Sequence, residues 1–539
     1  TYTRRRSINF TNVRKDRGAS AAAAAAAGKG GADAGPAKEH FWDVENFSLS
    51  YAYTDQEYRD VNTQYENEHT YRGSIAYQHG PKPKLIKPFE KVGFLGKSKW
   101  LKPIKEFNFY AGIKQVTFRT SIDRMYQERL VRPNPDIVSL PPAPTYNKNF
   151  NWNSQYGFRY ELTKSLKLDF NANNTALIGE TPGRVDPKVR GEYALWKDSV
   201  LTSLENWGEV TNYDHTVNLT YTLPLDKFPL TDWMTANATY GAGYQWDRAP
   251  LTQDTIGATI QNSQNLAING QLNFVNLYNK IKFLKAINDK GKAGQSNKPK
   301  TPKGAEDPKD PDGKDAKGKK DSGPKNTPLE SFFRVLMSVR NGSITYSQNS
   351  GILLPGYDKK TNILGMDDFL APGWGFILGQ QNHDLSGDIS RDFATYASEH
   401  GWPLHTPSIL NPHTNTRTET INARLTLEPF KSMRIELKAD RTYASNHSSF
   451  FRWNDSTDTY VNDSPREFGS FSVSTITWLT AFSSDDENFV SPVFQEMLAN
   501  RPLISGRLGA ENPNSADLAG SDYWYGYDTT SQDVIIPSF

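Results

Sequence analysis

The chain has 539 residues, a formal net charge of +2, a mean hydropathy of -0.68 and no cysteine. The near-neutral charge excludes the global basic field on which nucleic-acid binding depends, so no nucleic-acid partner is expected. The lack of cysteine excludes disulfides, zinc-thiolate sites, iron–sulfur clusters and a cysteine nucleophile.

The chain is polar on average, yet 12% of its residues are Phe, Trp or Tyr. It contains no run of 18 apolar residues that would make a transmembrane helix. This combination is typical of a β-barrel wall, in which one face of each strand meets lipid and the other meets water. An array of soluble β-sandwich domains can share the same composition.

Strands are predicted from the first residues onward. Thr1 to Val13 already reads as a strand, so we expect the chain to be an internal fragment of a longer protein. A second strand has apolar residues at alternate positions, and we expect these to face lipid: Phe47, Leu49 and Tyr51.

A hairpin with strict period-two alternation is predicted over residues 150–173. Its apolar face, expected to contact lipid, carries Trp152, Tyr156, Phe158, Tyr160, Leu168 and Phe170. Its hydrophilic face, expected to line a lumen, carries Asn151, Asn153, Gln155, Arg159, Asp169 and Asn171. The strands exceed the usual globular length of about five or six residues, as a bilayer requires.

The same alternation recurs over residues 213–247. The residues expected to face lipid are Val217, Leu219, Tyr221, Tyr240 and Tyr244, and those expected to face the lumen are Asn218 and Asn237. Further matches to this pattern bring the predicted number to about thirteen strands.

The predicted connections alternate in kind. Tight turns are expected at Thr163 to Ser165, Pro224 to Asp232 and Pro429 to Ser432, and long polar loops at residues 132–146, 175–210, 354–415 and 443–467. Short turns on one rim and long loops on the other are typical of bacterial outer-membrane barrels, with the loops outside the cell. Three long insertions, at residues 14–43, 80–106 and 275–330, fall on the turn side.

This pattern predicts four regions. Residues 1–274 and 331–482 form barrel strands with loops, residues 275–330 a periplasmic insertion, and residues 483–539 a periplasmic helical or irregular segment that leads to further strands. Residues 288–328 are rich in Lys, Asp, Pro and Gly and have no aromatic or branched aliphatic side chain, which predicts a disordered tether. The large loops carry aromatic residues expected to form a cap or to contact a partner: Trp374, Phe376, Trp402, Phe450, Phe451 and Trp453.

No group of residues favours catalysis, and no cofactor or metal is expected. The run Gly373 to Gly379 lacks the spacing and the strand-to-helix context of a dinucleotide loop. His400, His405 and His413 lie in one loop without zincin spacing, so we favour loop packing over metal binding. The acids Asp485 to Glu487 precede a predicted amphipathic helix, where helix capping is the better interpretation than calcium binding.

Several stretches resemble the SprA (Sov) family, the giant translocon of type IX secretion in the Bacteroidota. Those stretches are residues 2–15, 43–51, 97–102, 343–348, 354–356, 372–379, 428–430 and 434–437. The resemblance implies part of a very large single-chain outer-membrane β-barrel that exports folded cargo and opens laterally. The insert at 288–328 is not a family pattern.

The resemblance also implies partners. These are a PorV-type outer-membrane barrel, a periplasmic plug protein, cargo with a type IX C-terminal signal domain, other secretion-system components, the lipid bilayer and lipopolysaccharide. An extracellular β-sandwich adhesin and a TonB-dependent nutrient receptor barrel are the alternatives, and solubility without detergent would favour the adhesin.

Overall fold

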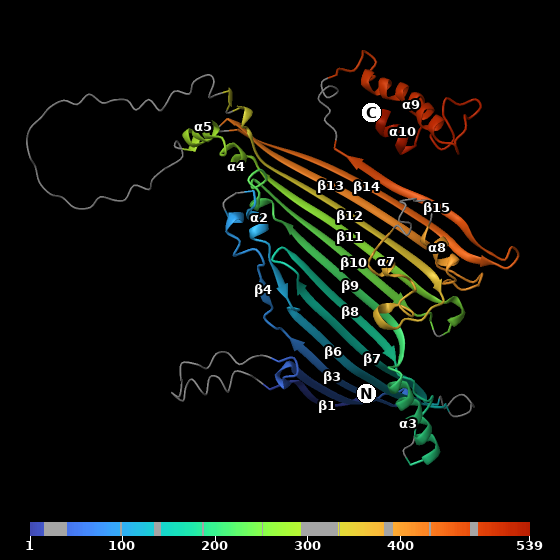
Figure 1. The fold of residues 1–539 in the computed structure, drawn as a ribbon. Coiled ribbons are helices and arrows are strands. Elements are labelled where there is room, and N and C mark those ends of the chain that lie inside the picture. Colours follow the sequence, from blue (N-terminus) through green and yellow to red (C-terminus); the bar gives the residue numbers. More distant parts are fainter. Residues whose placement is uncertain are drawn as a thin grey trace, which may run out of the picture.

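The computed structural model describes residues 1–15, 40–96, 100–133, 142–185, 188–250, 252–292, 332–333, 335–381, 392–430, 433–474 and 483–538. These residues form mainly β-structure, dominated by one antiparallel sheet of thirteen strands. The strands lie side by side in chain order, as Figure 1 shows. The strand prediction is therefore confirmed in number.

The strands of the large sheet are β1 (Tyr2–Val13), β2 (Phe47–Arg59), β3 (Thr63–His79), β6 (Gln115–Val131), β7 (Thr145–Glu161), β8 (Leu166–Leu177), β9 (Glu209–Leu223), β10 (Met234–Asp247), β11 (Ala258–Asn273), β12 (Val339–Tyr357), β13 (His413–Phe430), β14 (Met433–Asn454) and β15 (Thr459–Val473). They are 12 to 22 residues long. Two short strands, β4 (Lys84–Ile86) and β5 (Phe109–Ala111), pair with each other in the insertion between β3 and β6.

The α-helices are α2 (Lys102–Lys105), α3 (Arg190–Glu205), α4 (Phe274–Tyr278), α5 (Lys282–Lys292), α7 (Trp374–Ile377), α8 (Phe393–Glu399), α9 (Pro492–Glu511) and α10 (Gln532–Ser538). Short 3₁₀ helices are η1 (Val44–Asn46), η2 (Gly93–Gly96), η3 (Leu225–Lys227), η4 (Asp254–Ile256) and η5 (Ile363–Gly365). Within the described residues, no helix has both the length and the apolar character needed to cross a bilayer.

The antiparallel order gives the sheet two ends. The turn end carries the connections at 162–165, 224–233 and 431–432 and the insertions at 80–114 and 274–338. The loop end carries the connections at 132–144, 178–208 and 358–412 and three shorter ones at 60–62, 248–257 and 455–458. The long connections therefore lie at the ends to which the alternation assigned them.

One predicted loop is wrong. Residues 443–467 belong mostly to β14 and β15, which pair closely and are joined by only four residues, 455–458. The backbone ladder continues here although polar side chains occupy both faces, because strand pairing is made by main-chain hydrogen bonds.

The insertion at 274–338 also begins differently from the prediction. The predicted tether at 288–328 starts inside α5, where Asn288 is buried and accepts a hydrogen bond from Arg340. The rest of that segment, from 293 onward, lies outside the described residues.

The last described segment, residues 483–538, contains α9 and α10, which contact each other. The acids do not cap α9, because the helix begins after Ser491, whose hydroxyl accepts from the Phe494 amide. Asp486 instead closes its own turn with the Asn488 and Val490 amides. The ring of Trp524 occupies the space where Gly509 has no Cβ.

Candidate functional site: the two faces of the sheet

Residues directly opposite each other on paired strands share a face of the sheet. The registers of β7 through β11, which shift once between Thr175 and Ala176, therefore show how the two sets of predicted residues are distributed. Tyr156 is opposite Ala172, Ala172 is opposite His215, and His215 is opposite Tyr244. Traced in this way, all fourteen residues predicted to face lipid lie on one face, here called the apolar face.

The eight residues predicted to line a lumen all lie on the opposite face, here called the hydrophilic face. Arg159 is opposite Asp169, Asp169 is opposite Asn218, and Asn153 is opposite Thr175. Gly157 lies between them on this face, and a Cβ there would come within 2.7 Å of the Asn171 amide oxygen. Which face contacts lipid and which contacts water stays a prediction.

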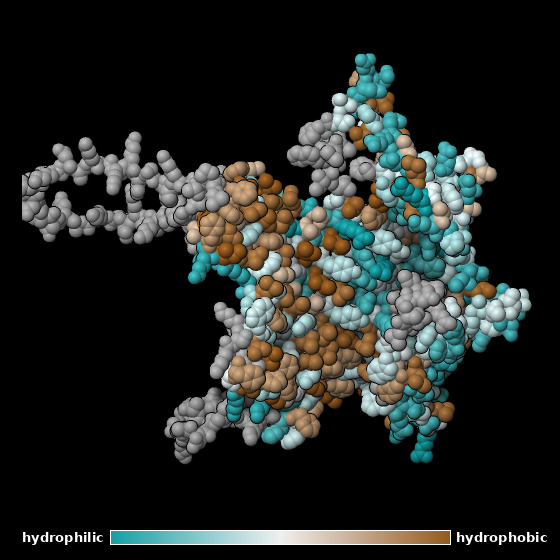
Figure 2. Space-filling model, turned by 45° about the horizontal axis from the view of Figure 1, so that its top comes forward, coloured by the Kyte–Doolittle hydropathy of each residue, from teal (hydrophilic) through white to brown (hydrophobic). Residues whose placement is uncertain are grey.

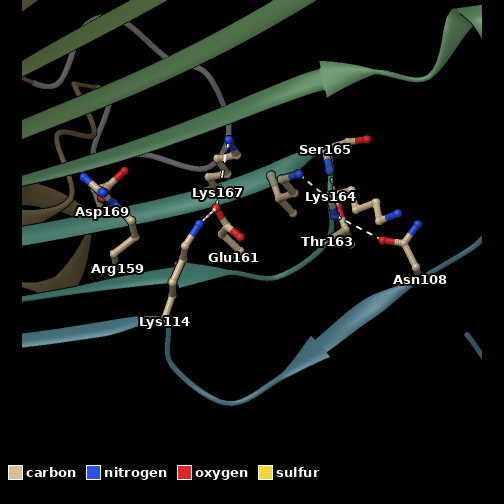
Figure 3. A network of polar contacts seen from close by, with 10 residues as sticks. Asn108, Lys114, Arg159, Glu161, Thr163, Lys164, Ser165, Lys167 and Asp169 are labelled. Carbon is tan, nitrogen blue, oxygen red and sulfur yellow. Dashed lines mark hydrogen bonds and ion pairs between the residues drawn. The ribbon is translucent and has the colours of Figure 1, made fainter. Parts of the chain in front are cut away.

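Ion pairs join neighbouring strands across the hydrophilic face. Arg72 pairs with Asp123, Arg159 with Asp169, Arg129 with Glu66, and Arg424 with Glu436. Near the turn end, the Glu161 carboxylate accepts from Lys114 and lies 4.0 Å from the Lys167 ammonium (Figure 3). Charge is thus neutralised locally on a surface that offers many amide and hydroxyl groups.

The apolar face exposes large side chains over many strands. Phe47, Leu49, Tyr51, Phe158 and Tyr221 are all more than a third exposed, as are Ile75, Phe118, Ile268, Ile344 and Leu437. Brown side chains accordingly gather in a broad area of Figure 2. Leaving such a surface in water would be a liability, which marks it as an interaction surface.

The apolar face is interrupted by charge on β13 and β14. Glu419 pairs with Arg417 on its own strand and lies 3.7 Å from Arg441 on the next. On these two strands the apolar residues of this face therefore lie nearer the turn end, such as the half-buried Leu425 and the exposed Leu437.

Toward the loop end, two connections fold over the apolar face and bury part of it. Helix α3 packs Val200 against Phe150 and Ile178, with Trp152 at the border of this cluster and stacked on Trp207. The connection at 358–412, here called the covering loop, buries Phe376, Ile377 and Phe393 against the strands. It is described at 358–381 and 392–412.

One residue predicted to contact lipid, Tyr244, is instead buried beneath the covering loop. Tyr244 is 2% exposed, packs against Phe376 and donates to the Gly365 carbonyl. It therefore belongs to a protein core and is closed to lipid. Tyr156 and Phe170 are partly buried against the same core.

Polar groups on the sheet hold the covering loop by its backbone. The His215 ring contacts the Ile377 carbonyl at 2.8 Å, and Tyr240 donates to the Leu378 carbonyl. Asn262 is 4% exposed, and its amide nitrogen donates to the carbonyls of Phe376 and Gln380 while its oxygen accepts from the Ile352 amide. The loop is thus fastened at many points.

The sequence interpretation missed His215 and Asn262. A signal was present, because both interrupt an apolar alternation with a polar side chain. A polar residue on an apolar face must find a partner when it is buried.

The six aromatic residues predicted for a cap or partner contact divide into three groups. Phe376, Trp402 and Phe451 are buried anchors of the core beneath the covering loop. Trp374 is 49% exposed and stacks on Phe369. Phe450 and Trp453 lie in β14 instead of a loop, and Trp453 packs against Tyr460.

The three histidines take packing roles. His400 lies against Tyr396 and Trp402, and His405 meets Trp453 edge-on. His413 is fully buried at the start of β13, with Nδ1 2.8 Å from the Leu353 carbonyl and Nε2 2.8 Å from the Asp392 carboxylate. Within the described ranges, no group of His, Asp and Glu is arranged to hold a metal ion.

Asp392 precedes α8 and joins the covering loop to β13 through His413. Burial alone would raise the pKa of this carboxyl group. The hydrogen bond and the charge of His413 outweigh that effect, so the pKa of Asp392 lies below its usual value of 3.8. Both ring nitrogens of His413 lie against oxygen atoms, one of the Leu353 carbonyl and one of the Asp392 carboxylate.

Neither a protein-family model nor a curated protein matches this chain.

Proposed function

We propose that this chain forms part of the wall of an outer-membrane, protein-conducting β-barrel of the type IX secretion kind. The observation that carries the proposal is the separation of the two faces. One sheet of thirteen sequential strands presents exposed apolar side chains on one face and paired charges and amides on the other. A bilayer on one side and water on the other require this distribution.

The single sheet favours a barrel wall over the alternative of a sandwich adhesin. In a β-sandwich, a second sheet packs on the apolar face at a distance of about 10 Å. Within the part of the chain that the structure describes, the only other sheet has two short strands, and large apolar residues stay exposed on five or more neighbouring strands.

Barrel closure is part of the proposal. Among the described strands, β1 and β15 each pair on one side only, and the odd number of antiparallel strands makes these two run in the same direction. A sheet in hydrocarbon needs its edges paired. We infer that further strands complete the wall, which the resemblance to the SprA family supports.

The hydrophilic face supplies the conducting surface. Its amides and hydroxyls exchange hydrogen bonds with passing proteins as water does, and its ion pairs leave little field to trap charged cargo. The resemblance supports the same partners as before: a PorV-type barrel, a periplasmic plug, cargo with a type IX C-terminal signal domain and the other secretion-system components. No cofactor and no catalytic step are needed.

Cross-linking to a stalled export substrate tests this function. A photoreactive amino acid is placed at Asn171, Asn218 or Asn237 on the hydrophilic face, with Val217 and Leu219 on the apolar face as matched positions. Cells then express cargo fused to a domain too stable to pass. We expect cargo adducts from the three asparagine positions only. Adducts from both faces, or from neither, would contradict a conducting role.

A further inference from the structure

A groove of about 500 Å³ opens at the turn end of the sheet. One wall is the apolar face of β8 to β11, and the other is the insertion between β3 and β6. Its apolar lining includes Phe107, Leu166, Leu219, Tyr221, Tyr240 and Leu266. The volume falls in the range of small-molecule sites, about 300 to 1,000 Å³.

The wall formed by the insertion is fixed to the sheet. The Lys164 amide donates to the Asn108 side chain at 3.1 Å (Figure 3). The Tyr110 amide donates to the Leu162 carbonyl at 3.1 Å. On the other side of the insertion, the Lys114 amide donates to the Arg159 carbonyl. These bonds to the β7–β8 hairpin hold the groove open without a ligand.

One cation and one anion line the same groove. The Lys227 ammonium lies 3.2 Å from the Glu106 carboxylate, and their side chains are 26% and 40% exposed. A paired positive and negative charge beside an apolar channel complements a zwitterionic headgroup. Its phosphate would meet Lys227 and its ammonium would meet Glu106.

The insertion has the composition of a membrane interface. Phe89, Phe94, Trp100, Phe107 and Phe109 are exposed there. They alternate with lysines at positions 82, 84, 87, 91 and 105. Aromatic rings settle at the headgroup level of a bilayer, and lysines extend from there to phosphate. The exposed rings beside these lysines point to lipid.

We propose that the groove binds an acyl chain of a zwitterionic phospholipid such as phosphatidylethanolamine, with its headgroup between Lys227 and Glu106. This inference depends on the proposed membrane placement, because Leu219 and Tyr221 belong both to the groove and to the exposed apolar face. The lipid would fasten the insertion to the wall at the level where the turn end leaves the bilayer.

Photolabelling in vesicles tests the site. The purified chain is reconstituted in phosphatidylethanolamine vesicles that contain a trace of the same lipid with a photoreactive acyl chain. Labelling of the groove peptides, residues 219–221 and 238–240, is compared with labelling of residues 423–427 on the same face. We expect several-fold more label in the groove. Ala238→Trp, which fills it, should remove the excess, whereas Ala423→Trp, on the same face outside it, should not.

A second substitution, at the residue proposed to bind the lipid headgroup, tests the site independently of Ala238→Trp. Lys227→Gln should lower groove labelling by phosphatidylethanolamine more than by a photoreactive diacylglycerol, which has no headgroup charge. Uniform labelling along the apolar face, unchanged by either variant, would overturn the groove proposal. It would leave the proposed membrane placement intact. No labelling anywhere on the apolar face would overturn both.

Discussion

Single polar side chains decide how the loop end is covered. Asn262 interrupts the series Ile260, Leu266 and Ile268 on the apolar face of β11 and satisfies four groups of the covering loop and β12. The alternation predicted the face on which such residues lie, because parity follows from strand geometry alone. It did not predict the cover, because a contact between residues more than a hundred positions apart leaves no local pattern.

Replacing Asn262 with Leu should loosen the covering loop. The substitution leaves buried carbonyls without donors, at a cost of about 1 to 3 kcal/mol. Limited proteolysis of the reconstituted protein should cut the loop faster than in the wild type. Asn265→Leu, three residues along the same strand on the hydrophilic face, should change the cutting rate little. Equal protection of both variants would show that Asn262 does not hold the loop.

Acid should release the same loop through Asp392. Because its pKa is lowered in the folded protein, its pairing with His413 stabilises the loop above the ordinary carboxyl pKa of 3.8. That contribution is lost as the pH falls through the lowered value. Pepsin digestion below about pH 4 should therefore cut the covering loop increasingly as the pH falls.

Asp392→Asn is the matched variant for this titration. It carries no charge at any pH, so chymotrypsin, used in place of pepsin near neutrality, should cut its loop more readily than the wild-type loop. Pepsin digestion of the variant should lack the added acid step. The nearby His447 also lowers the pKa of Asp392, and it is unchanged between the wild type and the variant. An acid step of equal size in the variant would assign the titration to another group.

At the scale of whole elements, strands were predictable where alternation is strict. The hairpin over 150–173 and the strands around 213–247 appear as β7 to β10 because every second side chain is apolar. The sequence predicts a loop at residues 443–467 because Ser445, His447 and Ser449 place polar groups on the apolar face of β14. β14 and β15 pair there through main-chain hydrogen bonds, which the pattern of side chains does not predict.

The insertion after β11 gives an element-scale prediction. Deleting residues 293–328 should leave assembly intact, because their composition supports no core. Deleting residues 288–328 should impair it, since Asn288 links Asn279 and Arg340 and its neighbour Ile287 is buried. Heat-modifiable migration of the assembled protein on gels measures both. Failure of the shorter deletion would make the insert a structural or docking element.

At the scale of the whole molecule, the sheet has one apolar and one hydrophilic face. Fourteen residues chosen for one face and eight for the other fall on opposite faces, and only Tyr244 is withdrawn from the surface by the covering loop. Composition and alternation were sufficient for this division. They do not specify whether or with how many strands the sheet closes, because closure depends on the outer edges of β1 and β15, which no other described strand pairs.

A spin-label scan along β9 tests most directly whether the apolar face contacts lipid. The chain has no cysteine, so single cysteines at positions 216 to 223 can each carry a label in the reconstituted protein. We predict that oxygen, which concentrates in hydrocarbon, reaches labels at 217, 219, 221 and 223. A polar nickel reagent should reach those at 216, 218, 220 and 222. Two results would contradict the membrane-wall assignment. One is accessibility that does not alternate from residue to residue. The other is that labels at 217, 219, 221 and 223 are shielded from both reagents, as in a dry protein core.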